Sequence, residues 1–523
     1  MDRRRGAGVG DAGVGDAGAA WGYLRARMQL RPQNERILFG LKLRQLRQAR
    51  ELSFQRLAEL TGLSVSYLNE IERGKKSPKP DKLAGLAAAL GVDPAELADH
   101  TLEAQMMPVA DLLRSNFLNE LPLDRFGIEL AKVVEIIASA PARVGAFIST
   151  LLELSRNYAL LDENFYRGAL RSWLEMHHNY LEDSEAFAKT CRAELGWDSA
   201  RVPDADDLAG ALARRHDYRV APGGLDAVAA FRGLERVFVP ADRSLLLAGT
   251  LAERDLRYHL AVEIGYQEMR VRDRSLTAPM TEITGFDMAL AHARAHAFAG
   301  ALLLPAERVD HELQGFFGDG EPALDVFEGL LEHYRVTPAL LLDRVSALIA
   351  RFRDIRSLFF IQLTEVAPGE LQMTRELHLG RQHRPHATGL LEHYCRRWVG
   401  ARLLLRGRDR TQIGIQASRY HGSDDEYLVL AIADKQHDGR RQSSFLGMPL
   451  TPELEGAIPA LLKADLRREV VNNTCERCPI ADCAERAAPP TVAASRQRRR
   501  EVKDAIERLQ REARQAARRG RRI

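Results

Sequence analysis

The sequence predicts a mainly α-helical chain in which two later regions combine helices with β-strands. Apolar residues recur at three- and four-residue spacing through most of the sequence before residue 200, as they do on the buried face of a helix. Short apolar segments bounded by turn residues appear only after residue 217. A chain of 523 residues, 45% hydrophobic and 28% charged, is long enough for about three or four domains with buried cores.

The amino-terminal segment has a composition that does not support folding. Residues 1–30 repeat GVGDAG, and Gly/Ala/Asp segments bury too little surface to fold, so we expect a disordered tail there. The first 20 residues contain no apolar stretch of signal-peptide length, and no apolar run approaches the ~18 residues that cross a bilayer. The chain is therefore expected to be cytoplasmic and to have no membrane partner.

Positive charge is concentrated near the carboxyl end. The net charge is +3, but residues 496–523 hold 12 Lys/Arg against 4 Asp/Glu, so the remainder is net negative. Contacts with nucleic acid are therefore expected from local patches. Residues 491–523 are predicted to form a basic helix, because Glu–Arg pairs recur three or four residues apart. This helix is interpreted either as a solvated surface or as a nonspecific DNA-binding arm.

Residues 31–99 carry the most specific pattern in the sequence. Ser53 and Ser64 suit the N-caps of two short helices, Gly62 suits the turn between them, and Gly74 suits the end of the second. Neighbouring segments predict three further helices, which gives five. Two short helices joined by a glycine turn form a helix-turn-helix, whose second helix enters the major groove of DNA. The alternative is an ordinary helical bundle with a lysine-rich turn.

The residues predicted to contact DNA lie on and around the second motif helix. Asn69 suits an adenine edge, serines reach bases or phosphates, and lysines hold phosphates. The predicted set is Gln55, Ser64, Val65, Ser66, Tyr67, Asn69, Lys75, Lys76 and Lys79. The segment resembles the lambda-repressor/XRE class of helix-turn-helix domains, with the resemblance resting on LAELTGLSVSYLNEIERGKKSPKPDKL. The resemblance implies a five-helix fold and a homodimer bound to palindromic operator DNA.

Residues 100–195 are predicted to form a helical linker or dimerisation region. Apolar residues again follow helical spacing, with Phe165, Trp173 and His177 on roughly one face. A bundle core, a dimer seam and one wall of a ligand cavity all remain open for that face. His177 and His178 are adjacent, so a straight helix turns them about 100° apart and a shared metal is not expected.

Residues 196–350 contain a motif that differs from the zinc-peptidase motif HExxH at both histidines. In HLAVEIGYQEM the glutamate is present as Glu263, whereas Val262 and Tyr266 occupy the histidine positions. The mixture of strands and helices, with a second helix ending in FAGALLLP, resembles the ImmA/IrrE-type metallopeptidase domain, a zincin-like α+β fold. By that resemblance His292 takes the place of the family's glutamate ligand.

The chemistry of HExxH decides what this degenerate domain is expected to do. Histidines four residues apart grip zinc while the glutamate handles the protons of water, and catalytic zinc takes three protein ligands. Val262 has no ligating atom and Tyr266 is of a type that rarely binds zinc, so we expect neither catalytic zinc nor enzymatic activity. The alternative is a metal held by His259, Glu263 and His292 in an active ImmA/IrrE-type metallopeptidase fused to a DNA-binding domain.

Residues 351–490 are predicted to form an antiparallel-sheet sensor domain with a cysteine cluster. Segments 355–366 and 369–379 suit a hairpin, and segments 411–420 and 427–434 suit further strands. A CxxC pair with a third cysteine five residues later can hold a metal, and an isolated cysteine in the same region is the best fourth ligand. A [4Fe–4S] cluster, zinc and reduced thiols without metal all remain open. The predicted ligands are Cys395, Cys475, Cys478 and Cys483.

The order of these regions resembles the short-chain fatty acyl-CoA regulator family over about residues 34–490. That order is an XRE helix-turn-helix, a helical segment, a degenerate ImmA/IrrE-like domain and a sheet domain ending in CxxCxxxxC. The resemblance implies a transcription regulator of short-chain fatty acid or acyl-CoA metabolism whose body senses an acyl-CoA thioester. An iron–sulfur or redox-sensing regulator is a further alternative.

Overall fold

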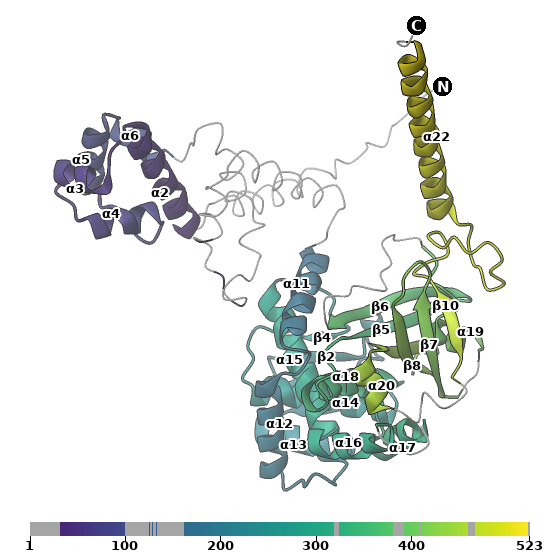
Figure 1. Ribbon diagram of the computed structural model, residues 1–523. Coiled ribbons are helices and arrows are strands. Elements are labelled where there is room, and N and C mark those ends of the chain that lie inside the picture. The colour runs from purple at the N-terminus through teal and green to yellow at the C-terminus, as the bar shows by residue number, and fades with distance from the viewer. Residues whose placement is uncertain are drawn as a thin grey trace, which may run out of the picture. The chain divides into compact units, whose positions relative to one another are not determined.

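The computed structural model divides the chain into two compact units, Met1–Ala169 and Leu170–Ile523 (Figure 1). It describes residues 32–99, 125, 128, 132, 162–317, 324–379, 392–407, 410–458 and 466–520. The predicted disordered tail at 1–30 and most of the predicted helical region at 100–195 lie outside the described residues. Within the described ranges, no helix combines the length and the apolar character needed to span a bilayer.

Five helices make up residues 32–99 of the first unit, as the sequence predicts. Apolar side chains of all five meet in one core, in which Leu43, Leu57 and Leu68 are fully buried. Proline in the first turn begins α5 and α6, where a missing backbone N–H costs nothing. The helices are α2 (Pro32–Ala49), α3 (Phe54–Thr61), α4 (Val65–Glu72), α5 (Pro80–Leu90) and α6 (Pro94–Ala98).

The second unit begins with helices packed on a small mixed sheet. The order of its four strands is β1-β3-β2-β4; β1 pairs parallel to β3, and β2 pairs antiparallel to both β3 and β4. Its strands are β1 (Arg219–Pro222), β2 (Arg236–Val239), β3 (Ser244–Leu247) and β4 (Thr277–Ala278). Helix α11 (Asp162–Met176) begins in the first unit and ends in the second. The helices that follow are α12 (Glu182–Glu194), α13 (Ala205–His216), α14 (Glu253–Glu268), α15 (Phe286–Leu303), α16 (Ala306–Glu312), α17 (Asp325–Tyr334) and α18 (Pro338–Phe352).

Helix α14, which carries the degenerate motif, is buried on every side over residues 259–266. It packs closely on α15 because Gly265 faces Phe298, and a Cβ at Gly265 would lie 2.8 Å from the ring atom Cδ1. A larger residue at 265 would push the two helices apart. The motif therefore lies inside the core, where any charged group needs a partner.

A six-stranded sheet follows, in the order β10-β7-β8-β9-β5-β6. The predicted antiparallel arrangement holds for every pair except β10, which lies parallel to β7. The predicted hairpin is present as β5 and β6, and residues 411–420 and 427–434 fall on β7 and β8. The strands are β5 (Leu358–Ala367), β6 (Glu370–Leu379), β7 (Gln412–Tyr420), β8 (Glu426–Lys435), β9 (Arg441–Pro449) and β10 (Arg468–Val471).

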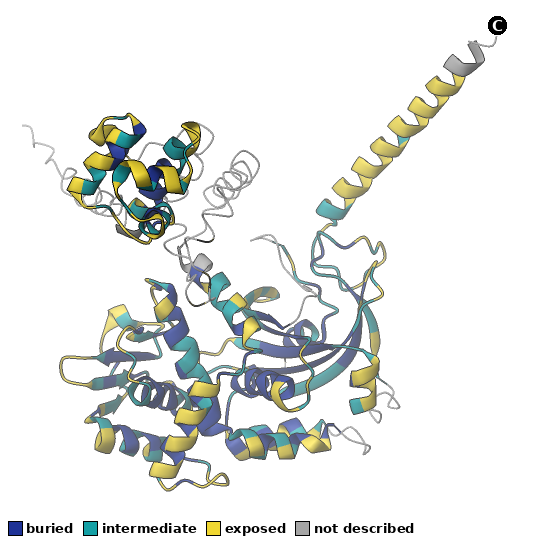
Figure 2. Cartoon of the chain, turned by 60° about the vertical axis from the view of Figure 1, so that its left-hand side comes forward, coloured by how far each residue is buried: buried dark blue, intermediate teal, exposed yellow. Residues whose placement is uncertain are grey.

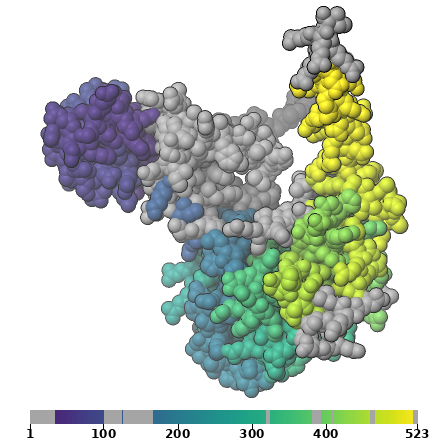
Figure 3. All heavy atoms as spheres, viewed as in Figure 1, coloured from purple at the N-terminus to yellow at the C-terminus, as the bar shows by residue number. Residues whose placement is uncertain are grey.

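The two faces of this sheet bury alternate side chains in different cores. Phe360 and Leu430 point into the core that contains α18, whereas Phe359 and Phe445 point into a second core with α19 (Val399–Leu405). The regions on either side of residue 350 thus share the first of these cores, and in Figure 3 their teal and green atoms adjoin without a break. A short helix, α20 (Pro452–Ala457), follows β9.

The predicted basic helix is present as α22 (Thr491–Gly520). Figure 2 shows it exposed along most of its length, and Val502, Ile506 and Leu509 are among its exposed residues. Its first turn is tied to the cysteine segment, because Ala493 N donates to Glu476 O at 2.9 Å. The helix thus begins directly on the segment that carries three of the cysteines.

Candidate functional site

The helix-turn-helix is formed by α3 and α4, and local interactions set both of its helices. Ser53 and Ser64 cap them by accepting hydrogen bonds from Arg56 N at 3.1 Å and Tyr67 N at 3.2 Å. Gly62 takes the left-handed φ of 69° that the turn between them requires. The predicted caps and turn are therefore present as expected.

Helix α4 is held against α2 by a close approach and a shielded ion pair. A Cβ at Gly40 would lie 2.5 Å from Ile71 O, so only glycine allows α2 to come this near. Arg47 binds both carboxylate oxygens of Glu72, at 2.6 and 3.0 Å, and its guanidinium lies over the ring of Phe54 at 4.2 Å. These contacts orient α4 relative to the rest of the domain, which is what a DNA-reading helix needs.

Most of the residues predicted to contact DNA are on the surface. Tyr67 and Asn69 are half-buried, and the other seven of the nine are exposed. Ser64 has a second role, because its side chain caps α4. Lys76 lies 2.7 Å from Glu70, and this hydrogen bond raises the pKa of the lysine above its usual value.

One basic residue near α4 is absent from the predicted set. Lys82 lies over the Tyr67 ring at 4.7 Å, alongside Lys76 at 5.8 Å, so Tyr67 is flanked by two cations. Lys82 is three residues beyond Lys79, and the KPDK spacing is the signal that could have identified it. The two ammonium groups place positive charge next to the recognition helix.

The second candidate site is the degenerate peptidase motif on α14. Glu263 is fully buried, and three side chains meet its carboxylate. Arg236, from β2, places Nη1 2.7 Å from Oε2; Arg274 places Nη1 2.6 Å from Oε1 in an ion pair; and the Tyr218 hydroxyl donates to Oε1 at 2.7 Å. Both oxygens of the motif glutamate are therefore engaged by guanidinium groups.

The surroundings of this ion cluster also accommodate its second positive charge. Arg274 lies over the rings of Phe238 and Tyr266, at 4.3 and 4.6 Å, where the π-electrons favour a cation. Burial, and then the negative charge of Glu263, raises the pKa of Tyr218 well above its usual range, so this hydroxyl keeps its proton and donates. Sequence reasoning missed both arginines, because they lie 27 positions before and 11 after the glutamate.

The other motif residues contribute no additional ligand for a metal at Glu263. Val262 is an apolar core residue, and the Tyr266 hydroxyl forms a hydrogen bond with His292 Nδ1 at 2.9 Å. His259 pairs with Glu235 at 3.2 Å. In the described ranges, no group of three or more His, Cys, Asp or Glu side chains is placed to hold a metal ion, so the alternative set of His259, Glu263 and His292 is not assembled.

The four cysteines of the predicted cluster line one space in the second unit. A bridge between Tyr394 and Thr474 brings the two segments together, and Cys475 N donates to His393 O at 2.8 Å. The pocket that they line together has a volume of about 10 Å³. Three of the cysteines are buried and one is half-buried, and the set is Cys395, Cys475, Cys478 and Cys483.

Backbone and side-chain donors hold the cysteine segment in shape. Ala487 N donates to Cys475 Sγ at 3.3 Å, and Arg486 donates to the carbonyl oxygens of Cys475 at 3.0 Å and Cys478 at 3.3 Å. The fifth cysteine, Cys191, is buried elsewhere, and burial raises the pKa of its thiol to about 12. Cys191 therefore does not belong to the pocket that the four predicted ligands line.

Comparison with known proteins identifies the family of the first unit. Residues 38–99 match a family model described as a helix-turn-helix domain. The control protein C.BamHI of Bacillus amyloliquefaciens is 39% identical over 69 residues, which are 13% of this chain and 85% of that protein. The uncharacterized HTH-type transcriptional regulator RghRB of Bacillus subtilis (strain 168) is 46% identical over 55 residues, 10% of this chain and 40% of RghRB.

One solved structure, of a Mycobacterium tuberculosis transcriptional regulator, is similar over 61% of this chain and 92% of its own, with 17% sequence identity and a TM-score of 0.43. The match with the control protein extends over most of that protein, and the family model covers the helices from α2 to α6. Through its first unit, the chain belongs to the XRE-type helix-turn-helix family of DNA-binding transcriptional regulators.

Proposed function

We propose that this regulator binds a palindromic operator as a homodimer and controls short-chain fatty acid or acyl-CoA metabolism in response to an effector held by its second unit. The observation that carries the DNA-binding part is α4, which is fixed by Arg47 and Glu72 and presents polar residues at its exposed start. Effector binding would change how two such helices are spaced on the operator.

In this proposal the residues of α4 divide into base readers and phosphate holders. Asn69 reads an adenine edge and Ser66 reaches a base or phosphate, whereas Lys75 and Lys79 hold phosphates from the exposed turn after α4. Selection of genomic fragments by the purified protein tests this directly. A chain that prefers no fragment over random duplex would contradict the proposal.

We further propose that the second unit uses a peptidase-like fold without cleaving peptides. Support comes from Glu263, whose two oxygens contact Arg236 and Arg274, so that guanidinium groups stand where a hydrolytic glutamate would face water. Peptide cleavage should stay at background in wild type and in Glu263→Gln. Metal-dependent cleavage that is lost in Glu263→Gln, or on replacing His259 or His292, would instead establish the metallopeptidase alternative.

For the cysteines we propose a [4Fe–4S] cluster, with zinc as the alternative. A zinc ion with thiolates at about 2.3 Å brings the sulfurs to roughly 3.8 Å from one another, whereas a cluster holds each thiolate on a separate iron. The four cysteines line one small pocket, which supports a shared site, although no group of three or more His, Cys, Asp or Glu side chains in the described ranges is placed to hold a metal ion. When bound, such a cluster would supply one-electron redox chemistry.

Anaerobic purification followed by iron, sulfide and zinc analysis tests this assignment. We expect iron and sulfide in the wild-type protein, loss of both in Cys475→Ser, and retention in Cys191→Ser, since Cys191 lies outside the set. Zinc in place of iron would establish the alternative, and a stable metal-free protein would exclude the site. Operator binding that changes on oxidation of the cluster would favour an iron–sulfur or redox-sensing regulator.

The effector itself is tested by a thermal-shift screen of short-chain acyl-CoA thioesters. A ligand that binds only the folded chain stabilises it by about 2.7 kcal/mol at a concentration of 100 times its Kd. We expect one thioester to raise the melting temperature at micromolar concentration and to alter operator affinity. A complete lack of response would contradict the acyl-CoA part of the proposal while leaving the DNA-binding family unchanged.

A further inference from the structure

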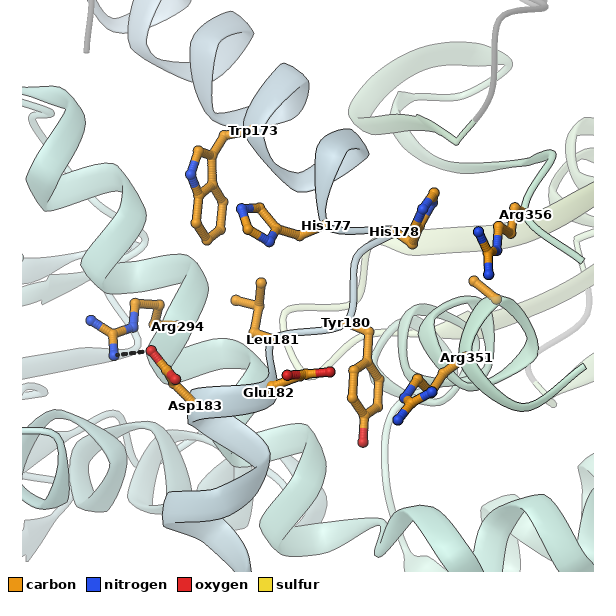
Figure 4. Close-up of a pocket in the computed structure, with 11 residues that line it drawn as sticks. Trp173, His177, His178, Tyr180, Leu181, Glu182, Asp183, Arg294, Arg351 and Arg356 are labelled. Atoms are coloured by element: carbon orange, nitrogen blue, oxygen red, sulfur yellow. Dashed lines mark hydrogen bonds and ion pairs between the residues drawn. The ribbon is translucent and has the colours of Figure 1, made fainter. Parts of the chain in front are cut away.

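A cavity of about 510 Å³ lies in the second unit, between the end of α11, the start of α12, α15 and the end of α18 (Figure 4). This volume is within the range of about 300–1,000 Å³ that is typical of small-molecule sites. The cavity is separate from the Glu263 cluster and from the cysteines, whose residues do not line it. The cavity is therefore a separate candidate site.

One wall of the cavity carries two aromatic rings. The rings of Trp173 and His177 lie 4.1 Å apart, one helical turn from each other at the end of α11. Both face the cavity in Figure 4, and neither is fully buried. Trp173 is half-buried, His177 is exposed and their rings are tilted by 39° to each other, so each can offer a ring face to a planar group. The sequence left open whether this helix face lines a core, a seam or a cavity, and the structure places these two rings at a cavity.

The opposite wall carries cations. Arg351 and Arg356 line the cavity on the side away from Trp173 (Figure 4). Arg356 is 2.7 Å from Asp354, whereas Arg351 forms no ion pair with any residue that the structure describes and rests over the Tyr180 ring at 5.7 Å. An arginine held by an aromatic ring, without a carboxylate partner, leaves its N–H groups free for an anion.

The lining holds three arginines, Arg294, Arg351 and Arg356, against two acidic residues, Glu182 and Asp183, so it is net positive. Asp183 pairs with Arg294 at 3.5 Å, which offsets one acid with one base at the far end of the cavity. Glu182 also lines the cavity, close to Tyr180 in Figure 4. The region around Arg351 and Arg356 thus remains the part of the cavity best suited to negative charge.

The loop between α11 and α12 is held in an unfavourable backbone shape at this site. His178 and Asn179 have φ of 50° and 56°, in the left-handed region that residues other than glycine rarely adopt. Asn179 is buried, and its Nδ2 donates to Asp343 Oδ1 at 3.3 Å and to Ser346 Oγ at 3.1 Å. Strained residues fixed in this way concentrate at ligand sites, and this loop delivers both His178 and Tyr180 to the lining.

We propose that this cavity is the effector site and that it binds a small anion bearing a planar ring, with the chemistry of an adenine nucleotide. The ring would stack on Trp173 and His177, and phosphate oxygens would accept hydrogen bonds from Arg351 and Arg356. This assignment rests on the proposed sensing function of the second unit. It does not depend on whether the nucleotide is free or is the nucleotide part of a thioester.

Isothermal titration of the full chain tests the proposal with four probes: propionyl-CoA, ADP, adenosine and inorganic pyrophosphate. We expect binding of at least one probe that combines ring and phosphates, and weaker binding of adenosine and pyrophosphate. Loss of a charge-assisted hydrogen bond should weaken binding about tenfold or more in Arg351→Gln. Trp173→Leu should have a similar effect, whereas Trp173→Phe, which keeps a ring, should retain binding.

The matched control is Arg272→Gln, because Arg272 is exposed and does not line the cavity. Melting temperatures close to wild type would show that each variant is folded. If a probe binds equally well to Arg351→Gln and Trp173→Leu, the cavity assignment is wrong while the sensing function stands. If ADP binds through these residues but no thioester alters operator binding, the cavity is correct and the acyl-CoA proposal is wrong. If no probe binds, the inference is overturned.

Discussion

At the scale of single residues, the chemistry of the second unit depends on what surrounds each carboxylate. Glu263 stands at the proton-handling position of a peptidase motif, yet it contacts two arginines and a tyrosine and is fully buried. A buried charge with such partners contributes to the stability of the fold, because removing it leaves buried cations without a counter-ion.

The change Glu263→Gln should therefore destabilise the second unit. It leaves Arg236 and Arg274 buried without their counter-ion, and breaking a buried pair in this way costs about 3–5 kcal/mol. Urea unfolding of wild type and variant measures the difference. Glu307→Gln is the matched control, because its ion pair with Lys189 is 80% exposed on both sides and should contribute little. Equal stability of Glu263→Gln and wild type would contradict this account of the cluster.

Asp434, on β8, predicts a pH dependence of stability. Burial raises its pKa from 3.8 to about 6, although Arg254 lies 2.8 Å away and opposes the shift. The folded carboxyl thus holds its proton more tightly than the unfolded one. The resulting stability is complete below pH 3.8, and it is lost as the pH rises through 6. A shift of this size corresponds to about 3 kcal/mol, at about 1.4 kcal/mol per pKa unit.

Replacing Asp434 by Asn removes this titration. We measure the free energy of unfolding of Asp434→Asn and wild type in urea at a series of pH values. The difference, variant minus wild type, should increase between pH 4 and pH 7. Asp206→Asn serves as control, because Asp206 is exposed at the start of α13. Parallel pH curves for wild type and Asp434→Asn would show that the carboxyl titrates normally.

At the scale of elements, the position of α4 is what makes the first unit a DNA reader. Gly40 permits its close approach to α2, and Arg47 fixes its angle through Glu72. The loop that follows α4 carries exposed lysines, which would touch only the phosphate backbone. Base readout and phosphate binding should therefore respond differently to mutation.

Lys79→Gln should weaken DNA binding uniformly across sequences. Loss of one phosphate contact should reduce the slope of log K against log salt by about 1. Asn69→Ala should instead relax preference at one base pair. Fluorescence anisotropy at several salt concentrations distinguishes the two, with Lys189→Gln in the second unit as control. An unchanged slope for Lys79→Gln would remove this lysine from the DNA interface.

The same titration of a chain that lacks residues 496–523 tests whether α22 binds DNA. An unchanged slope of log K against log salt indicates a solvated helix, and a smaller slope indicates a DNA-binding arm.

At the scale of the whole molecule, a palindromic operator requires two copies of the helix-turn-helix. We expect light scattering of the purified protein to give a mass twice the 58.5 kDa of one chain. Operator fragments with two half-sites should bind with half-sites about one helical turn, or a multiple of it, apart. A monomer that binds a single half-site with full affinity would contradict the dimeric arrangement.

The sequence by itself determined the local features of this protein. Caps at Ser53 and Ser64, the turn at Gly62 and the three clustered cysteines are visible in it because each depends on neighbours within a few residues. The same holds for the absence of both motif histidines, which needs no structure to be recognised. For this reason the helix-turn-helix and most strands could be predicted.

Only the tertiary structure decided which distant residues meet. Arg236 and Arg274 reach Glu263 from opposite sides of the motif, and Cys395 joins Cys475 across 80 positions of chain. The cavity at Trp173 combines helices whose residues lie more than 170 positions apart. A buried charge needs an opposite charge beside it, and tertiary packing decides which distant residue supplies it. The periodicity of the sequence therefore does not identify these contacts.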